Sequence, residues 1–359
     1  MSDGTTETAK EPPFDKRLAL LLAMAMFVLV FDTSLMNVSI SSVVHDLDTT
    51  VSSVQAAIAI EALVSAAFIL IGSKVGDLIG RKRENKPTLI DPDLFRSKMF
   101  RLGISGQLLQ NIALGAAMIA LPIFLQMVLE YNALETGLSL APLSLTMFGV
   151  AVLAGKKAGT RRPSTIIRAG FALLATGMVL LIAVVPRADS GWYLFLPLLI
   201  VGAGLGLLVS QLNNYTLSPI SDERVSEAAG VNSAGGSFGL SFGLAFAGAI
   251  MLATLTITFT DMAKSSVVLS PTEQQQVADG LDDDAEVMSN AALEELLVGQ
   301  PQDVQNEIIR INTQARPLAL QVALLVPLLA ALLGLVTSFR MMRLPDPKAS
   351  GAAEGIALG

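Results

Sequence analysis

Long apolar runs separated by polar connections constrain this chain more than any other feature of its sequence. Eight such runs follow one another, and their lengths suit the ~20 helical residues that cross a ~30 Å hydrocarbon core. The composition agrees, with 52% hydrophobic and only 15% charged residues and a mean hydropathy of +0.60. The sequence therefore predicts an all-α membrane protein of about eight transmembrane helices.

The predicted organisation alternates spans with tails and loops. The eight spans are residues 18–43, 54–71, 102–129, 137–155, 166–185, 192–212, 235–259 and 317–339. We divide the chain into a disordered tail (1–17), the first two helices with a basic loop (18–83), helices three to seven (84–259), an acidic loop (260–316), the last helix (317–339) and a second tail (340–359). Within the acidic loop, a helix start at Ser270-Pro-Thr-Glu273 and two stretches with helical spacing predict short amphipathic helices.

Lysine and arginine predict the orientation, because positive residues that flank spans stay on the cytoplasmic side. With the N-terminus inside, about 20 of the 24 lysines and arginines fall in inside segments. We therefore expect a multi-pass protein of the plasma (inner) membrane with both termini in the cytoplasm and the acidic loop outside.

Enzyme chemistry has no recognisable support in the sequence. The chain has no cysteine and a single histidine, His45, in a short loop with two aspartates. A metal site needs several converging ligands, so a solvated loop histidine is the better interpretation. Phosphate-binding glycine loops, Ser/His/Asp groupings and HExxH motifs are also missing. We expect no enzyme activity, no cofactor, no metal and no nucleic-acid partner.

Two acidic residues lie inside predicted spans, Asp32 in the first and Glu61 in the second. An ionisable group there costs ~2.5 to 3.5 kcal/mol on insertion scales, which makes both functional candidates. A carboxyl in a low-dielectric site has a raised proton affinity and can load and release a proton as access alternates. The alternative is that Asp32 only holds helices together through a neighbour such as Asn37, and that Glu61 faces a partner helix.

Small and amide residues point to helix contacts and to a cavity. Gly235, Gly239 and Gly243 recur every four residues and form one ridge, which favours close helix packing. Uncharged polar residues inside spans either line a substrate path or bond between helices. The candidate cavity-lining residues are Asn37, Gln107, Gln110, Asn111, Gln126 and Gln211.

The loop after the second span carries the sharpest motif, GSKVGDLIGRKR. It resembles the signature loop of the major facilitator superfamily, matched at Gly72, Gly76, Asp77, Gly80, Arg81, Lys82 and Arg83. FDTSLMNVSI, with Asp32 and Asn37, is similar to the first-helix motif of the fourteen-helix drug:proton antiporter branch of that superfamily. FLQMVLEYNALETGLSLAP resembles the loop that opens the last helices of the second half. The resemblance implies proton-coupled export of small amphipathic or cationic compounds across the lipid bilayer.

The resemblance is discontinuous near Arg83 and Glu84. The segment after Glu84 resembles the part of the family that follows the eighth helix, so six helices are missing at this point. The chain then keeps one six-helix half and two helices of the other. Three interpretations stay open: an exporter whose cavity a homodimer rebuilds, an inactive truncated remnant, and a membrane interaction module.

Overall fold

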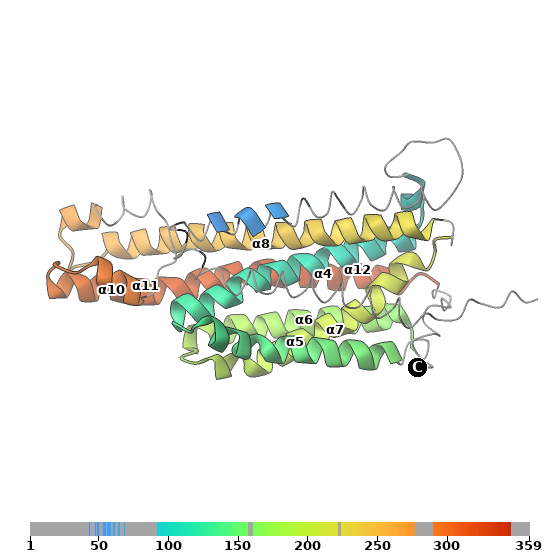
Figure 1. The fold of residues 1–359 in the computed structure, drawn as a ribbon, viewed down its shortest axis with the longest axis horizontal. Coiled ribbons are helices and arrows are strands. Elements are labelled where there is room, and N and C mark those ends of the chain that lie inside the picture. Colours follow the sequence, from blue (N-terminus) through green and yellow to red (C-terminus); the bar gives the residue numbers. More distant parts are fainter. Residues whose placement is uncertain are drawn as a thin grey trace, which may run out of the picture.

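The computed structural model describes residues 92–156, 161–221, 224–275 and 290–345, together with residue 277 and scattered helical positions between residues 43 and 68. Six helices in this part of the chain are long and apolar enough to cross a membrane. They lie side by side along one direction and form an elongated bundle (Figure 1). The fold is therefore the all-α membrane bundle that the sequence predicts. The first two predicted spans lie largely outside the described residues.

The bundle begins with helix α4, which is Lys98–Ile123 and follows a short 3-10 helix, Pro92–Arg96. Ser97 caps α4, because its hydroxyl accepts a hydrogen bond from the Phe100 amide at 3.3 Å. Pro122 lies near the end of α4 and has no N–H to donate. The chain continues as a π-helical turn, η2, over Phe124–Val128.

Helices α5 to α7 follow with short connections. Helix α5 is Ala133–Lys156 and starts with a capping box, in which the backbone and side chains of Asn132 and Glu135 exchange two hydrogen bonds of 3.0 Å. Helix α6 is Pro163–Val184, with proline in its first turn, and ends in the 3-10 turn η3, Val185–Arg187. The 3-10 turn η4, Gly191–Leu194, leads into α7, Phe195–Leu217.

The last two spans are much longer than a bilayer requires. Helix α8 is Val225–Lys264, which at 1.5 Å per residue is roughly 60 Å. Helices α11, Gln302–Ala323, and α12, Leu325–Met341, form a second rod of the same length. Leu324 separates them, because Pro327 in the first turn of α12 cannot donate back to the preceding turn.

Both long rods project beyond the other helices at one end of the bundle, where α4 and α6 end (Figure 1). We call this the distal end, and the end with Lys98, Lys156 and Met341 the proximal end. Beyond the bundle, α8 packs on α11, and the short helix α10, Asn290–Leu296, packs on α11 as well. The predicted acidic loop is thus largely a folded extension: α8 continues to Lys264 and α11 already begins at Gln302.

The predicted helix start in this extension is confirmed. The Ser270 amide donates to Glu273 Oε2 at 2.7 Å, and the Glu273 amide donates to Ser270 Oγ at 3.4 Å. These reciprocal bonds lower the pKa of the Glu273 carboxyl, chiefly through the Ser270 hydroxyl and then through its backbone. Short amphipathic helices are also found where the sequence predicts them, in α10 and in the first half of α11.

The contacts between helices repeat within the bundle. Helix α4 packs on α8 and α12, and helix α7 packs in the same way on α5 and α6. Exchanging α4 with α7, α5 with α8 and α6 with α12 maps these contacts onto one another, and it leaves the α4–α7 and α6–α12 contacts in place. Since α4 runs from the proximal to the distal end and α7 runs back, the two groups of three helices form an inverted repeat (Figure 1).

Candidate functional site

The amides predicted on α4 gather where α4 meets α8. Gln107 and Asn111 are half-buried, and the amide of Asn111 donates to the Gln107 carbonyl oxygen at 2.9 Å. A Cβ placed on Gly236 would lie 3.3 Å from Asn111 Nδ2 and 3.6 Å from Gln107 Nε2. The absence of a side chain at Gly236 therefore leaves room for both amides beside α8.

An aromatic stripe on α8 borders this contact. Phe238, Phe242 and Phe246 are 49%, 43% and 47% exposed, and their rings stack with centroid distances of 6.3 Å and 5.2 Å. Each of the first two precedes a glycine, Gly239 or Gly243, that packs on α4. Aromatic faces bind both apolar bodies and cations. Our sequence analysis missed this stripe, although its spacing of four residues was visible.

Two further predicted amides are buried inside the bundle. Gln110 on α4 is 3% exposed and Gln211 on α7 is 2% exposed. Within the described residues, neither Gln110 Oε1 nor Gln211 Nε2 has a hydrogen-bond partner, and the Tyr215 hydroxyl also has none. Buried polar atoms usually find a partner, which is often a water molecule. These side chains therefore give the interior of the bundle an unsatisfied polar surface.

The remaining predicted amide, Gln126, is buried in the π-helical turn η2. Such turns occur frequently at functional sites, because they interrupt the regular hydrogen bonds of a helix.

A polar pair that the sequence analysis did not select joins α7 to α8, where Asn232 Nδ2 donates to Asn213 Oδ1 at 3.0 Å. Helix α8 thus has polar side chains at its contacts with both α4 and α7.

Most of the predicted proton-coupling and motif residues lie outside the described residues. These are Asp32, Asn37 and the signature-loop residues Gly72, Gly76, Asp77, Gly80, Arg81, Lys82 and Arg83. Glu61 is described, and it lies on a helical stretch with an exposed side chain. The coupling role of Asp32 and Glu61 stays a prediction.

The predicted glycine ridge lies along α4. A Cβ on Gly239 would come within 2.6 Å of the Leu108 carbonyl oxygen, and one on Gly243 would overlap the Ile112 carbonyl oxygen. Gly235 is less constrained, because its nearest neighbour would be the Ile104 side chain at 3.7 Å. Backbone approach this close requires glycine at positions 239 and 243.

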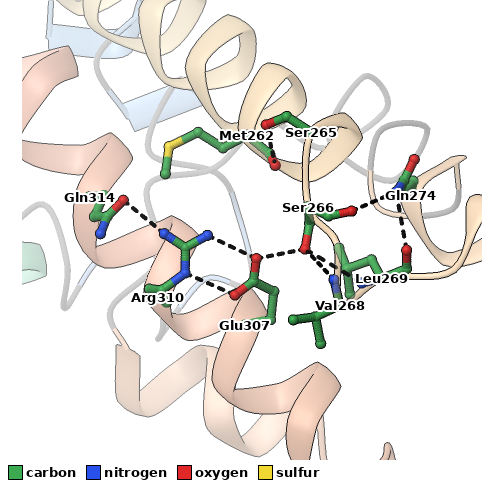
Figure 2. Close-up of polar contacts among 9 residues, drawn as sticks. All are labelled: Met262, Ser265, Ser266, Val268, Leu269, Gln274, Glu307, Arg310 and Gln314. Atoms are coloured by element: carbon green, nitrogen blue, oxygen red, sulfur yellow. Dashed lines mark hydrogen bonds and ion pairs between the residues drawn. The ribbon is translucent and has the colours of Figure 1, made fainter.

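A charged cluster ties the two rods together in the distal extension (Figure 2). Glu307 of α11 accepts a 2.6 Å hydrogen bond from the Ser266 hydroxyl, which follows α8, and two bonds of 2.8 Å from Arg310. Arg310 and then Ser266 hold the pKa of the Glu307 carboxyl at about 2. The first half of α11 carries Asp303, Glu307 and Arg310, so it lies outside the apolar span that follows Pro317.

A second polar cluster joins the extension to the end of α4. The Arg316 guanidinium is buried and donates to the Met127 carbonyl oxygen, to the Asn312 carbonyl oxygen at 3.2 Å and to Asn290 Oδ1 at 2.7 Å. Glu130 accepts from the Asn290 amide at 2.8 Å, at the start of α10. These bonds join α10 and α11 to the residues at the end of η2.

The described residues contain no group of three His, Cys, Asp or Glu side chains close enough to hold a metal ion. What they do present is a bundle of six helices long and apolar enough to cross a membrane, with amides at the α4–α8 contact and partly exposed aromatic rings on α8. This arrangement is that of a multi-pass α-helical membrane protein.

The family follows from comparison with known proteins. Residues 84–244 match the sequence model of the Major Facilitator Superfamily. The chain is 30% identical to the uncharacterized transporter YebQ of Escherichia coli over 167 residues, which are 46% of this chain and 36% of that protein. It is 30% identical to the putative multidrug resistance protein MdtD of an Enterobacter strain over 149 residues, 40% of this chain and 30% of that protein. It is also 26% identical to the multidrug resistance protein Stp of Mycobacterium tuberculosis over 204 residues, 57% of this chain and 37% of that protein.

Over residues 84–244 the chain thus resembles the Major Facilitator Superfamily, and the relatives it matches include proteins named as transporters and multidrug resistance proteins. The predicted resemblance is confirmed at this level, and the matches are to transporters rather than to enzymes. The inverted repeat of three plus three helices agrees, since each six-helix half of these transporters contains one. The alignments span only about a third of the length of the curated relatives.

Proposed function

We propose that the chain derives from a proton-coupled exporter of small amphipathic or cationic compounds in the plasma membrane. The observation that carries this proposal is the α4–α8 contact, where Gln107 and Asn111 lie against Gly236 of α8, the helix that also carries the partly exposed stripe Phe238, Phe242 and Phe246. Amides can orient a polar head group while stacked rings contact an apolar or cationic body. The names of the relatives, two of which are multidrug resistance proteins, support this substrate class.

The proposed orientation places the proximal end in the cytoplasm. Cationic side chains gather there in the described part of the chain: Arg96, Lys98, Arg101, Lys156, Arg161, Arg162, Arg168, Arg224, Arg340 and Arg343. The distal end carries Arg187, Lys264, Arg310 and Arg316. Positive residues stay on the cytoplasmic side of short loops, which supports cytoplasmic termini and an outer extension.

Loss of six helices near Arg83 and Glu84 remains part of the proposal. The match to the family model begins at residue 84, which supports a junction at this position. The described residues after the junction then build one complete six-helix half, with its inverted repeat. In this proposal Asp32 or Glu61 carries the proton, and two copies of the chain combine to enclose a cavity.

The second candidate is an inactive remnant that inserts into the membrane without transporting. Alignments that span only about a third of the relatives favour it, because transport requires a cavity between two halves. A membrane interaction module is the third candidate, with the exposed helix faces or the distal extension as the contact surface.

Uptake of a cationic dye into inverted membrane vesicles, driven by a proton gradient, tests the proposal. The native chain is expected to accumulate dye above empty vesicles, and Asp32→Asn to lose that accumulation, because an amide cannot carry the proton. Glu61→Gln provides the matched comparison for the second carboxyl. Dye uptake no higher than in empty vesicles, with the inserted protein verified, would exclude export of this compound class and favour the remnant.

A further inference from the structure

Helix α5 differs from the other five apolar helices in having an open face. In its most apolar window none of the residues is buried, whereas between 39% and 67% are buried in the others. Leu138, Leu145 and Phe148 are 65%, 70% and 71% exposed. Residues 136–155 carry no charge, so the whole face lies within the apolar span.

The glycines of α5 contact nothing, unlike those of its neighbours. A Cβ on Gly137, Gly149 or Gly155 would have no atom within 4 Å. On α7, in contrast, a Cβ on Gly202 would overlap the Leu143 carbonyl oxygen, and one on Gly206 would lie 2.5 Å from that of Met147. Glycine weakens a helix by about 1 kcal/mol relative to alanine unless it permits a close contact. The open glycines of α5 therefore indicate a contact that the described part of one copy of the chain does not make.

The inverted repeat identifies what kind of element is missing. In the inverted repeat, α8 is the counterpart of α5, and a helical segment from the start of the chain packs on it. In that segment, Val54 and Ile58 are 6% and 4% exposed and belong to the same buried apolar cluster as Met251 and Leu255 of α8. Figure 1 shows this first segment beside α8, with α5 on the opposite side of the bundle. Equivalent positions take equivalent partners, so within the described residues α5 lacks the transmembrane helix that would cover it.

We propose that α5 of a second copy of this chain covers this face, in a two-fold symmetric dimer. The membrane fixes both copies in the same orientation, and a two-fold axis along its normal brings the same face together. The face is self-complementary, because bulky Leu145 and Phe148 alternate with Ala141, Ser144 and Gly149 at helical spacing. The inference rests on the membrane placement assumed in the proposed function, but not on transport.

Single-cysteine crosslinking tests the interface directly, because the chain contains no cysteine. Leu145→Cys and Leu138→Cys place a thiol on the open face, and Val179→Cys on α6, which is 52% exposed, is the matched control. After mild oxidation of membranes that contain the full chain, most of the Leu145→Cys protein is expected at twice the monomer mass. The Val179→Cys protein is expected to stay monomeric.

Three results would overturn the proposal: no dimer with either α5 variant, equal dimer with Val179→Cys, or an adduct whose mass shows another protein. Light scattering of the cysteine-free chain in nanodiscs adds a measurement without crosslinking, in which Ala141→Leu should convert dimer to monomer. A Leu145→Cys dimer without dye transport would support the interface and contradict the proposed function. Dye transport without that dimer would contradict the interface and the two-copy cavity, and would leave proton-coupled export in place.

Discussion

At the scale of single residues, the strongest local constraints lie outside the predicted cavity. The Ser266 hydroxyl joins the end of α8 to Glu307 of α11 through one short hydrogen bond, and Arg310 of α11 donates two more to the same carboxylate (Figure 2). Glu307 is buried, and a buried carboxylate is tolerated only when its oxygens are paired. The cluster therefore stabilises the extension, and removing Ser266 or Arg310 leaves the buried Glu307 carboxylate with fewer hydrogen bonds.

Replacing Glu307 with glutamine tests this cluster through its pH dependence. The folded pKa of Glu307 is about 2, below the ordinary value of 4.5, so the native carboxylate stabilises the extension at pH above about 4.5. That contribution falls as the pH drops from there toward 2. Glu307→Gln should thus increase amide hydrogen exchange in α11 at pH 7, with a smaller difference from the native chain near pH 3. Glu295→Gln on the exposed side of α10 is the control. An equal difference at both pH values would contradict the assigned role.

Sequence reasoning succeeded where local chemistry decides the structure. The Ser270–Glu273 helix start and the apolar spans follow from residues close together in the chain. It failed for Glu307 and Arg316, since their partners Ser266 and Met127 are remote in sequence. The amides of α4 were selected correctly as polar groups in a span, but only packing decides that Gln107 borders α8 while Gln110 is buried.

At the scale of helices, glycine sets how closely the elements approach. The α4–α8 contact brings the backbone of one helix against the other at Gly239, Gly243 and Gly115. The α5–α7 contact uses Gly202 and Gly206 in the same way. Without water to drive association, close backbone packing is a main source of helix affinity in lipid. The repeated contacts are thus built from repeated glycines.

Two alanine substitutions on α8 separate packing from helix propensity. Gly243→Ala would push a methyl group into the Ile112 carbonyl oxygen, which overpacks the contact and should destabilise the fold by about 1–3 kcal/mol. Gly235→Ala finds an ordinary contact at 3.7 Å and should be neutral or slightly stabilising. Thermal unfolding of the purified chain in detergent measures both. Similar melting temperatures for the two variants would show that the helices separate here at little cost.

At the scale of the whole molecule, two rods of about 60 Å run through a bundle of shorter helices and continue past it. A bilayer with a ~30 Å core covers only half of such a rod, so one end must stand in water. The distal end is the only candidate in the described part of the chain, because α11 carries its charged residues there. The charged distal half of α11 therefore determines both how deep the rods lie in the membrane and which of their ends stands in water.

Accessibility of introduced cysteines checks which side the rods reach. Val267 at the tip of the extension is 99% exposed, and Arg343 lies just after α12 at the proximal end. In intact cells, a membrane-impermeant maleimide should label Val267→Cys fully and Arg343→Cys only after permeabilisation. The cationic proximal end predicts this result, since moving its arginines and lysines across the membrane is unfavourable. The reverse pattern would invert the topology and turn the acidic extension toward the cytoplasm.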